Sequence, residues 1–197
     1  MLLALLACGD DDGYCGDGSC FCAPGEDCRF VCAAPPCHIE CGDEASCVAD
    51  CGNGSCICGS QASCDFGCHS PPCHVTCHAE SECGGTCANG TCLCERGSSC
   101  EFDCASGPCH VECEGDNALC AGTCANGSCS CGPDSDCGFS CLDHNCSATC
   151  AAGSSCVLLC PDGRAGEQGC EFVSCAAGTP VVCPGGMATT CGAAACP

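Results

Sequence analysis

The chain has 197 residues, of which 39 are cysteine, six are phenylalanine, one is tyrosine and none is tryptophan. Its 25 acidic residues stand against only three basic ones, and the net charge of -22 excludes proteins that bind the phosphates of nucleic acids or anionic lipid headgroups. So few large apolar residues cannot form a conventional core, so we expect disulfide bonds to supply most of the stability and an oxidising compartment to house the chain.

The N-terminal sequence carries a possible export signal. Leu5-Leu6-Ala7-Cys8 resembles the lipobox of bacterial lipoproteins, in which the cysteine is acylated and becomes the new N-terminus. The resemblance implies that Cys8 is the lipid attachment site, that 1–7 is a partial signal peptide whose true start lies upstream, and that 8–14 is an acidic tether. Gly9, in place of an aspartate after the cysteine, implies the outer membrane or cell surface. No segment has the roughly 20 apolar residues of a membrane span, so attachment to the membrane would be by lipid alone.

The remaining 38 cysteines, enough for 19 disulfides, follow a repeating pattern. From residue 15 the order C-x4-C-x-C-x5-C-x3-C-x4-C-x3-C-x5/6-C-x3 recurs with a period of 36 or 37 residues and eight cysteines per period. The four full repeats are 15–50, 51–86, 87–123 and 124–159, and 160–197 is a degenerate repeat with a C-terminal cap. A period of this length predicts stacked supersecondary units.

Each repeat contains four short units that alternate as β-strands do. The first is a C-x-C unit after an Asp-Gly or Asn-Gly pair, which favours a tight turn because both residues tolerate positive φ. The other three are C-x3-C units whose third residue, with the flanking cysteines, predicts an inward face. These third residues are Phe30, Phe66, Phe102 and Phe139 in the second unit, Ile39, Val75, Val111 and Ala148 in the third, and Ala49, Gly85, Gly122 and Leu158 in the fourth.

Strand geometry limits how the cysteines can pair. Two cysteines four positions apart on a strand are separated by roughly 13 Å, whereas a disulfide needs Cα atoms about 4.4–6.8 Å apart. The two cysteines of one C-x3-C unit must therefore reach a neighbouring strand or the opposite wall, and stacking at about 4.8 Å permits bridges between successive turns. The pattern predicts an all-β, cystine-laddered β-solenoid, with a coil of either 18 or 36 residues. The alternative is a string of small modules, because Cys87-Ala-Asn-Gly-Thr-Cys92-Leu-Cys94 resembles a stretch of EGF-like domains.

Several molecular functions can be weighed from the same residues. Many thiols and the C-x-C units resemble metallothionein, so thiolate binding of soft metals is the alternative function. His38, His74 and His110 occupy the same repeat position and could form a surface column for Cu or Zn, and the acidic surface could bind divalent cations weakly. Regular threonine ranks, on which the resemblance to disulfide-bearing insect antifreeze solenoids would depend, are missing.

No catalytic motif and no cofactor-binding loop is present in the sequence. We therefore expect a non-enzymatic structural or interaction protein at the cell surface or outside the cell. Such a rigid rod would be anchored by lipid at Cys8 and would have an extracellular protein or glycan as its unknown partner.

Overall fold

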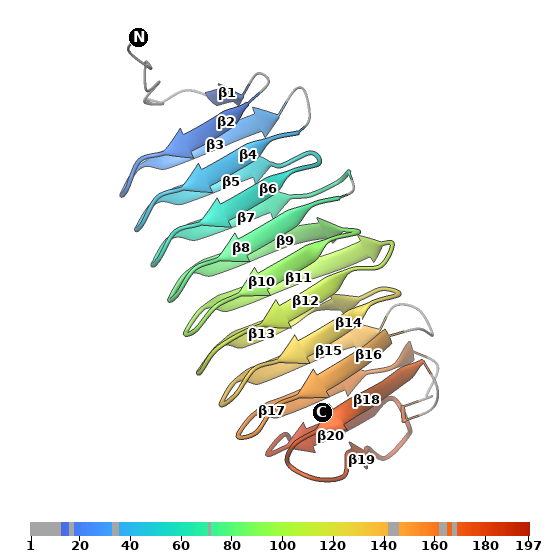
Figure 1. Cartoon of the computed structure of the whole chain (residues 1–197). Helices are drawn as coiled ribbons and strands as arrows, with labels where there is room; N and C mark the ends of the chain where they lie inside the picture. Colours follow the sequence, from blue (N-terminus) through green and yellow to red (C-terminus); the bar gives the residue numbers. More distant parts are fainter. Residues whose placement is uncertain are drawn as a thin grey trace.

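The computed structural model describes residues 13–15, 18–32, 36–70, 72–141, 146–161, 165–166 and 169–197. In this part of the chain the backbone winds into a β-solenoid, in which strands alternate between two facing sheets (Figure 1). One sheet has 11 strands and the other has nine. We call them sheet A and sheet B. The prediction of an all-β, disulfide-rich solenoid is confirmed, and the stack is continuous rather than a string of separate modules.

Sheet A contains the odd-numbered strands up to β17, followed by β20 and β19. Its strands are β1 (Gly13–Cys15), β3 (Asp27–Cys32), β5 (Ser46–Asp50), β7 (Ser63–Gly67), β9 (Glu82–Ala88), β11 (Ser99–Ser106), β13 (Leu119–Cys124), β15 (Asp136–Cys141), β17 (Ser155–Leu159), β20 (Ala188–Gly192) and β19 (Val181–Val182). Sheet B contains β2 (Ser19–Cys22), β4 (His38–Cys41), β6 (Ser55–Cys58), β8 (His74–Cys77), β10 (Thr91–Cys94), β12 (His110–Cys113), β14 (Ser128–Cys131), β16 (Cys146–Cys150) and β18 (Cys170–Cys175).

The register of sheet A settles the length of one coil. Cys28 of β3 pairs with Cys47 of β5, and Cys47 pairs with Cys64 of β7. One coil therefore takes 19 residues and the next takes 17, and together they make the 36-residue repeat. One sequence repeat therefore forms two coils. Of the two coil lengths that the sequence allowed, 18 and 36 residues, the shorter is correct.

Inward phenylalanines and small residues alternate along sheet A. Every second strand carries a phenylalanine that is at most 2% exposed: Phe30, Phe66, Phe102 and Phe139. The register-paired position on the strands between them holds a smaller residue: Ala49, Gly85 and Gly122. The alternation lets each ring spread over a small neighbour, except at Phe139, whose partner on the C-terminal side is the buried Leu158.

The inward face of sheet B alternates in a different way. The third-unit residues Ile39, Val75, Val111 and Ala148 are buried, as predicted. On the strands between them, the paired inward position is a half-cystine: Cys56, Cys92 and Cys129. Half-cystines line both walls, with four of the buried phenyl rings on sheet A and mainly aliphatic groups on sheet B, which explains how so few large apolar residues can fill the core.

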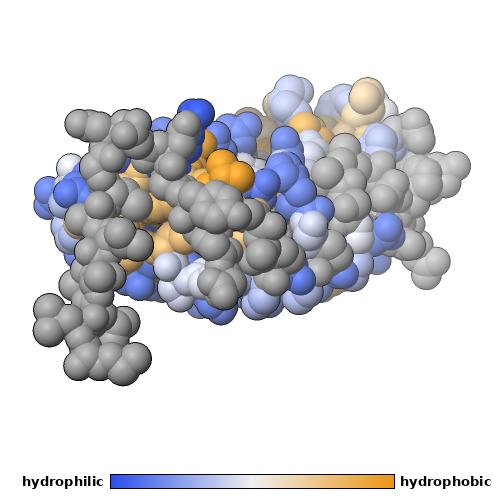
Figure 2. All heavy atoms as spheres, turned by 90° about the horizontal axis from the view of Figure 1, so that it is seen from above, coloured by the Kyte–Doolittle hydropathy of each residue, from blue (hydrophilic) through white to orange (hydrophobic). Residues whose placement is uncertain are grey.

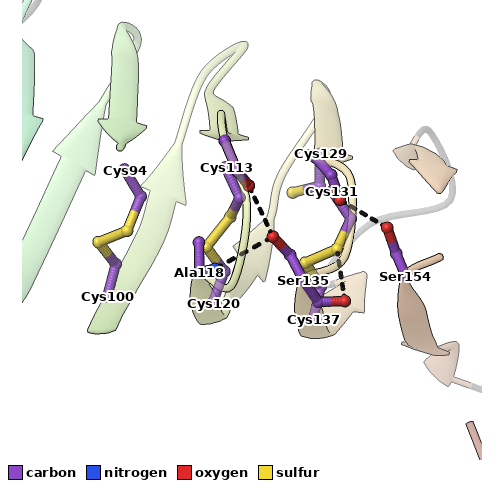
Figure 3. Close-up of a disulfide and its surroundings, with 12 residues drawn as sticks. Cys94, Cys100, Cys113, Ala118, Cys120, Cys129, Cys131, Ser135, Cys137 and Ser154 are labelled. Carbon is purple, nitrogen blue, oxygen red and sulfur yellow. Dashed lines mark hydrogen bonds between the residues drawn. A yellow bond between two sulfur atoms is a disulfide. The ribbon is translucent and has the colours of Figure 1, made fainter. Parts of the chain in front are cut away.

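Two columns of disulfides run along the two edges where the sheets meet. The first cystine column, one bridge per coil, is Cys22–Cys28, Cys41–Cys47, Cys58–Cys64, Cys77–Cys83, Cys94–Cys100, Cys113–Cys120, Cys131–Cys137, Cys150–Cys156 and Cys175–Cys191. The second is Cys32–Cys37, Cys51–Cys56, Cys68–Cys73, Cys87–Cys92, Cys104–Cys109, Cys124–Cys129, Cys141–Cys146 and Cys160–Cys170. Figure 3 shows three successive rungs of the first column.

The pairing decides between the two possibilities that the sequence left open, a neighbouring strand or the opposite wall. The two cysteines of a C-x3-C unit do not bond to each other, as strand geometry required: Cys28 bonds to Cys22, and Cys32 bonds to Cys37. However, these bridges do not join successive turns of the solenoid. They cross to the opposite wall within one coil and close loops of five or six residues. Loop closure this short stabilises by only about 2 kcal/mol per bridge, so the hydrogen bonds of the parallel sheets, and not the disulfides, hold one coil to the next.

The loops beside the first cystine column are stacked turns. In the loop after β2, the Glu26 N–H donates to the carbonyl of Ala23 at 3.1 Å, Pro24 is the second residue and Gly25 has φ 74°. This is a type II turn, in which proline is favoured second and positive φ is required third. The residue that follows the positive φ in later coils is small and buried: Ala45, Ala62, Ser81, Ser98, Ala118, Ser135 and Ser154.

Buried serines in this column replace missing backbone partners. The Ser135 hydroxyl is 2.9 Å from the carbonyl oxygen of Gly115 and accepts the N–H of Ala118 at 3.1 Å, both in the preceding coil. The Ser154 hydroxyl donates in the same way to the carbonyl of Gly132 at 2.5 Å (Figure 3). These hydroxyl groups fill the turn and join two coils, because they bond to loop N–H and carbonyl groups that have no backbone partner there.

The Asn-Gly turns form, but glycine is needed for a different reason than we expected. Asn89 and Asn126 do take positive φ, at 47° and 50°. Gly90 and Gly127 are not among the residues with positive φ. A Cβ at Gly90 would instead overlap the carbonyl oxygen of Cys73 in the preceding coil, so glycine permits close approach of two backbones.

The C-terminal end differs from the rest of the stack. β20 pairs antiparallel with β17, and β19 pairs antiparallel with β20, whereas the preceding strands are parallel. Residues 172–197 contain no charged side chain.

At the other end of the molecule, seen from above, hydrophilic residues line the visible margins and apolar residues lie between them (Figure 2). The fold as a whole is that of a rigid structural repeat protein.

Candidate binding face

The outer face of sheet A contains a shallow groove. It has a volume of about 440 Å³ and crosses the six strands from β5 to β15. Its lining residues, together with the backbone of the intervening cysteines, are Ser46, Val48, Ser63, Asp65, Glu82, Gly84, Ser99, Glu101, Leu119, Ala121 and Asp136. We call this surface the groove. It runs along the solenoid axis because each coil contributes two outward residues, two positions apart on the same strand.

The groove is hollow because its floor has small residues. Gly84 is paired with Asp65 on one side and with Glu101 on the other, and a Cβ added at Gly84 would come no closer than 3.8 Å, to the Glu101 carbonyl oxygen. Ala121 holds the equivalent position in β13. A strand alternates its side chains between core and solvent, so these outward positions contribute nothing to the core and are free to be small.

The groove carries negative charge. Four carboxylates line it, from Asp65, Glu82, Glu101 and Asp136, and its lining contains no arginine. The carboxylates come from four different strands, β7, β9, β11 and β15, so adjacent ones are separated by about 4.8 Å or more along the axis. Three serine hydroxyls and two exposed apolar side chains, Val48 at 41% and Leu119 at 54%, complete its lining.

A second hollow of about 400 Å³ lies on the same face toward the N-terminal end. It shares Val48 and Asp65 with the groove and also includes Arg29, Asp50 and His69. Arg29 is the one cationic side chain in the described lining of the two hollows. The outer face of sheet A is therefore a continuous depression with carboxylates along most of its length.

The three candidate metal-binding histidines lie on the opposite face of the molecule. His38, His74 and His110 stand on β4, β8 and β12 of sheet B, where they form a column on every second strand. A hydroxyl residue occupies the strand that follows each histidine: Ser55, Thr91 and Ser128. The predicted column exists as a row of positions.

The column does not bring its imidazoles together. One strand, β6, lies between the strands of His38 and His74, so the two residues are about 10 Å apart along the axis, whereas each nitrogen ligand of a zinc ion lies about 2 Å from the metal. His38 Nδ1 instead lies 2.6 Å from the Ser55 hydroxyl, and His110 Nδ1 lies 2.7 Å from the Ser128 hydroxyl. The structure therefore offers these histidines hydroxyl partners in place of a shared metal ion.

The other two histidines near His74 in the sequence also separate in space. His69 lines the second hollow on sheet A, 3.5 Å from the Thr86 hydroxyl. His78 lies in the turn after β8, where its Nδ1 is 3.1 Å from the carboxylate of Glu95 on the next coil. The three side chains thus belong to three different sides of the solenoid.

Sulfur atoms come close together inside the first cystine column. Three groups of three sulfurs lie within 4.8 Å of one another: Cys22, Cys41 and Cys47; Cys77, Cys83 and Cys100; and Cys113, Cys120 and Cys137. Each of these sulfurs belongs to a disulfide bond. The thiolate is the form that binds metals, so these groups could hold a soft metal only after their bridges were reduced.

Cys8 lies outside the described residues, so its role as the lipid attachment site stays a prediction. No helix in the part of the chain that the structure describes is long and apolar enough to cross a bilayer. The sequence did not single out the groove. The signal that could have found it is the recurrence of Asp65, Gly84 and Glu101 at outward positions of neighbouring coils.

Comparison of the chain with protein-family models, with curated proteins and with solved structures finds no match.

Proposed function

We propose that this protein is an exported, non-enzymatic rod that is anchored to a membrane by lipid at Cys8 and presents its long faces for interaction. The observation that carries the proposal is the pair of continuous cystine columns, with one bridge at each edge of a coil. Cytosolic glutathione and thioredoxin keep thiols reduced, so a chain with this many bridges suits a non-cytoplasmic, oxidising location. The proposal assigns no catalytic residue and no cofactor.

The repeat architecture supports a structural role. Each coil is hydrogen-bonded to its neighbours through both sheets, so bending the stack would break bonds in both walls at once. A stiff stack of this kind holds its two ends apart and offers a long surface on each side. An outer-membrane or cell-surface location would place that surface where an extracellular protein or glycan can reach it.

The test is the intact mass of the protein expressed from its own gene in a bacterium, before and after reduction and alkylation. We expect each bridge to lower the native mass by about two units relative to free thiols, with further mass from acyl chains at Cys8. A Cys8→Ser variant should lose the acyl mass and leave the membrane fraction while keeping its bridges. Native protein whose cysteines all react with the alkylating agent would overturn the proposal and favour the thiolate metal-binding alternative.

A further inference from the structure

We propose that the groove on sheet A binds an extended, basic segment of a partner polypeptide. The inference rests on the proposed function, because it names the class of partner that the exported rod would bind. It is carried by three properties of the groove: its shape, the spacing of its carboxylates and the position of its apolar side chains.

The shape suits an extended chain. The groove crosses six strands, from β5 to β15, and strands about 4.8 Å apart give it a length of about 24 Å. An extended peptide rises about 3.3 Å per residue, so about seven residues would fill this length. The floor at Gly84 and Ala121 is open enough to admit a peptide backbone, while the hollow is too shallow to enclose a compact ligand.

The carboxylates favour a row of cations over a single ion. Asp65, Glu82 and Glu101 follow one another on successive strands β7, β9 and β11 and alternate between the two outward rows of the groove. Among the described residues, no three carboxylate or histidine groups have ligand atoms within 4.8 Å of one another. Charges spread in this way match lysines or arginines distributed along a chain, and the net charge of -22 would steer such a segment toward the protein.

The remaining lining residues match the other parts of a basic peptide. Val48 and Leu119, near the two ends of the groove, expose apolar surface on which the aliphatic stems of lysine or arginine can lie. The hydroxyls of Ser46, Ser63 and Ser99 form one row along the groove and can donate to or accept from a peptide backbone. The lining therefore offers contacts to the charges, the stems and the main chain of one extended segment.

The test is fluorescence anisotropy with a fluorescein-labelled octapeptide of alternating lysine and alanine, added to the oxidised protein at low salt. The groove variant Asp65→Asn, Glu82→Gln, Glu101→Gln removes three negative charges from the groove. Its matched control, Glu40→Gln, Glu112→Gln, Glu114→Gln, removes three charges from the sheet B side and its adjoining loop. We expect about a tenfold loss of affinity in the groove variant and less than about twofold in the control.

A third variant tests the shape of the groove without changing its charge. Gly84→Tyr places a ring on the groove floor, where an added Cβ has space, and should weaken peptide binding about fivefold or more while the circular dichroism spectrum stays unchanged. Equal losses in the two charge variants, or wild-type binding by Gly84→Tyr, would show diffuse attraction only and overturn the inference. Such a failure would leave the bridge count and the lipid at Cys8 untouched, so it is distinguishable from failure of the proposed function.

Discussion

Gly85 lies directly beside Phe66 in the parallel pairing of β7 with β9, and a Cβ at Gly85 would overlap the carbonyl oxygen of Phe66. Gly85 also has φ 136°, a conformation that other residues rarely adopt. The next inward residue along sheet A is Phe102 on β11, so the glycine sits between two buried rings. The absence of a Cβ at Gly85 therefore lets the backbones of β7 and β9 lie close together at this point of the wall.

The first prediction concerns this glycine. Gly85→Ala should lower the free energy of unfolding by about 1–3 kcal/mol or more, because the added methyl group collides with a backbone that two sheets hold in place. Gly138→Ala is the matched control, since Gly138 is exposed on β15 and has no atom within 4 Å of an added Cβ. Guanidinium unfolding of the oxidised proteins measures both. A control change within about 0.5 kcal/mol is expected, and equal destabilisation of the two variants would contradict the steric explanation.

The second prediction concerns the turn column beside the first cystine column. Ser135 is 1% exposed, and its hydroxyl accepts the N–H of Ala118 in the preceding coil. Ser135→Ala leaves that buried N–H without its partner, which should cost about 1–3 kcal/mol of unfolding free energy. The exposed Ser63 on β7 provides the control, Ser63→Ala. Amide hydrogen exchange adds a local measurement: we expect faster exchange at Ala118 in the first variant alone, and unchanged exchange there would disprove the role of Ser135.

The third prediction is the pattern of tryptic fragments without reduction. The chain has three arginines, Arg29, Arg96 and Arg164, and no lysine, so trypsin acting on the urea-unfolded, thiol-blocked protein cuts at three places. Cys22 bonds to Cys28 before the first cut, whereas Cys94–Cys100 and Cys160–Cys170 span the second and third. Cys20 is also disulfide-bonded, and if it too pairs within its coil the fragment that ends at Arg29 should separate freely, whereas 30–96, 97–164 and 165–197 should stay linked.

The same digest distinguishes the two ways in which the coils could be cross-linked. Bridges between successive coils would join Cys22 or Cys28 to a cysteine of the next coil and would hold the first fragment to 30–96. Mass spectrometry of the unreduced digest reads this directly, and reduction provides the control because it should release all four fragments. Retention of the first fragment would show that the pairing within coils is wrong.

The fourth prediction concerns the histidine column. His38, His74 and His110 stand on every second strand, about 10 Å apart along the axis, and the Nδ1 atoms of His38 and His110 already lie against serine hydroxyls. Isothermal titration of the oxidised protein with zinc should give no heat above that of buffer. A defined binding heat that His74→Asn abolishes would contradict this expectation and restore the metal-binding hypothesis for the column.

Much of the fold followed from the order of residues. The eight-cysteine repeat predicted stacked strands, and the third positions of the C-x3-C units, such as Phe66 and Val75, identified the buried face correctly. These predictions succeed because a strand has a side-chain period of two, which is visible in a single repeat. The separation of the two cysteines within a C-x3-C unit was equally certain, because the length of an extended chain excludes their bonding.

Other properties depended on how the coils lie against one another. The length of a coil and the partner of each cysteine could not be read from the spacing, because a cysteine such as Cys28 has candidate partners in its own coil and in the next at similar distances. The groove likewise depends on Asp65, Glu82 and Glu101, which are 17 to 19 residues apart in the chain and become neighbours only through the register of sheet A.

The sequence by itself determined that this protein is a cysteine-bridged stack of strands with a phenylalanine wall, since local alternation and chain length decide those features. Only the tertiary structure decided that each bridge closes within a coil, that His38 and His110 lie against serine hydroxyls of the next coil, and that carboxylates line a groove on sheet A. The physical reason is that backbone hydrogen bonding between coils determines which distant residues become neighbours. The register of this hydrogen bonding cannot be read from the sequence of a single repeat.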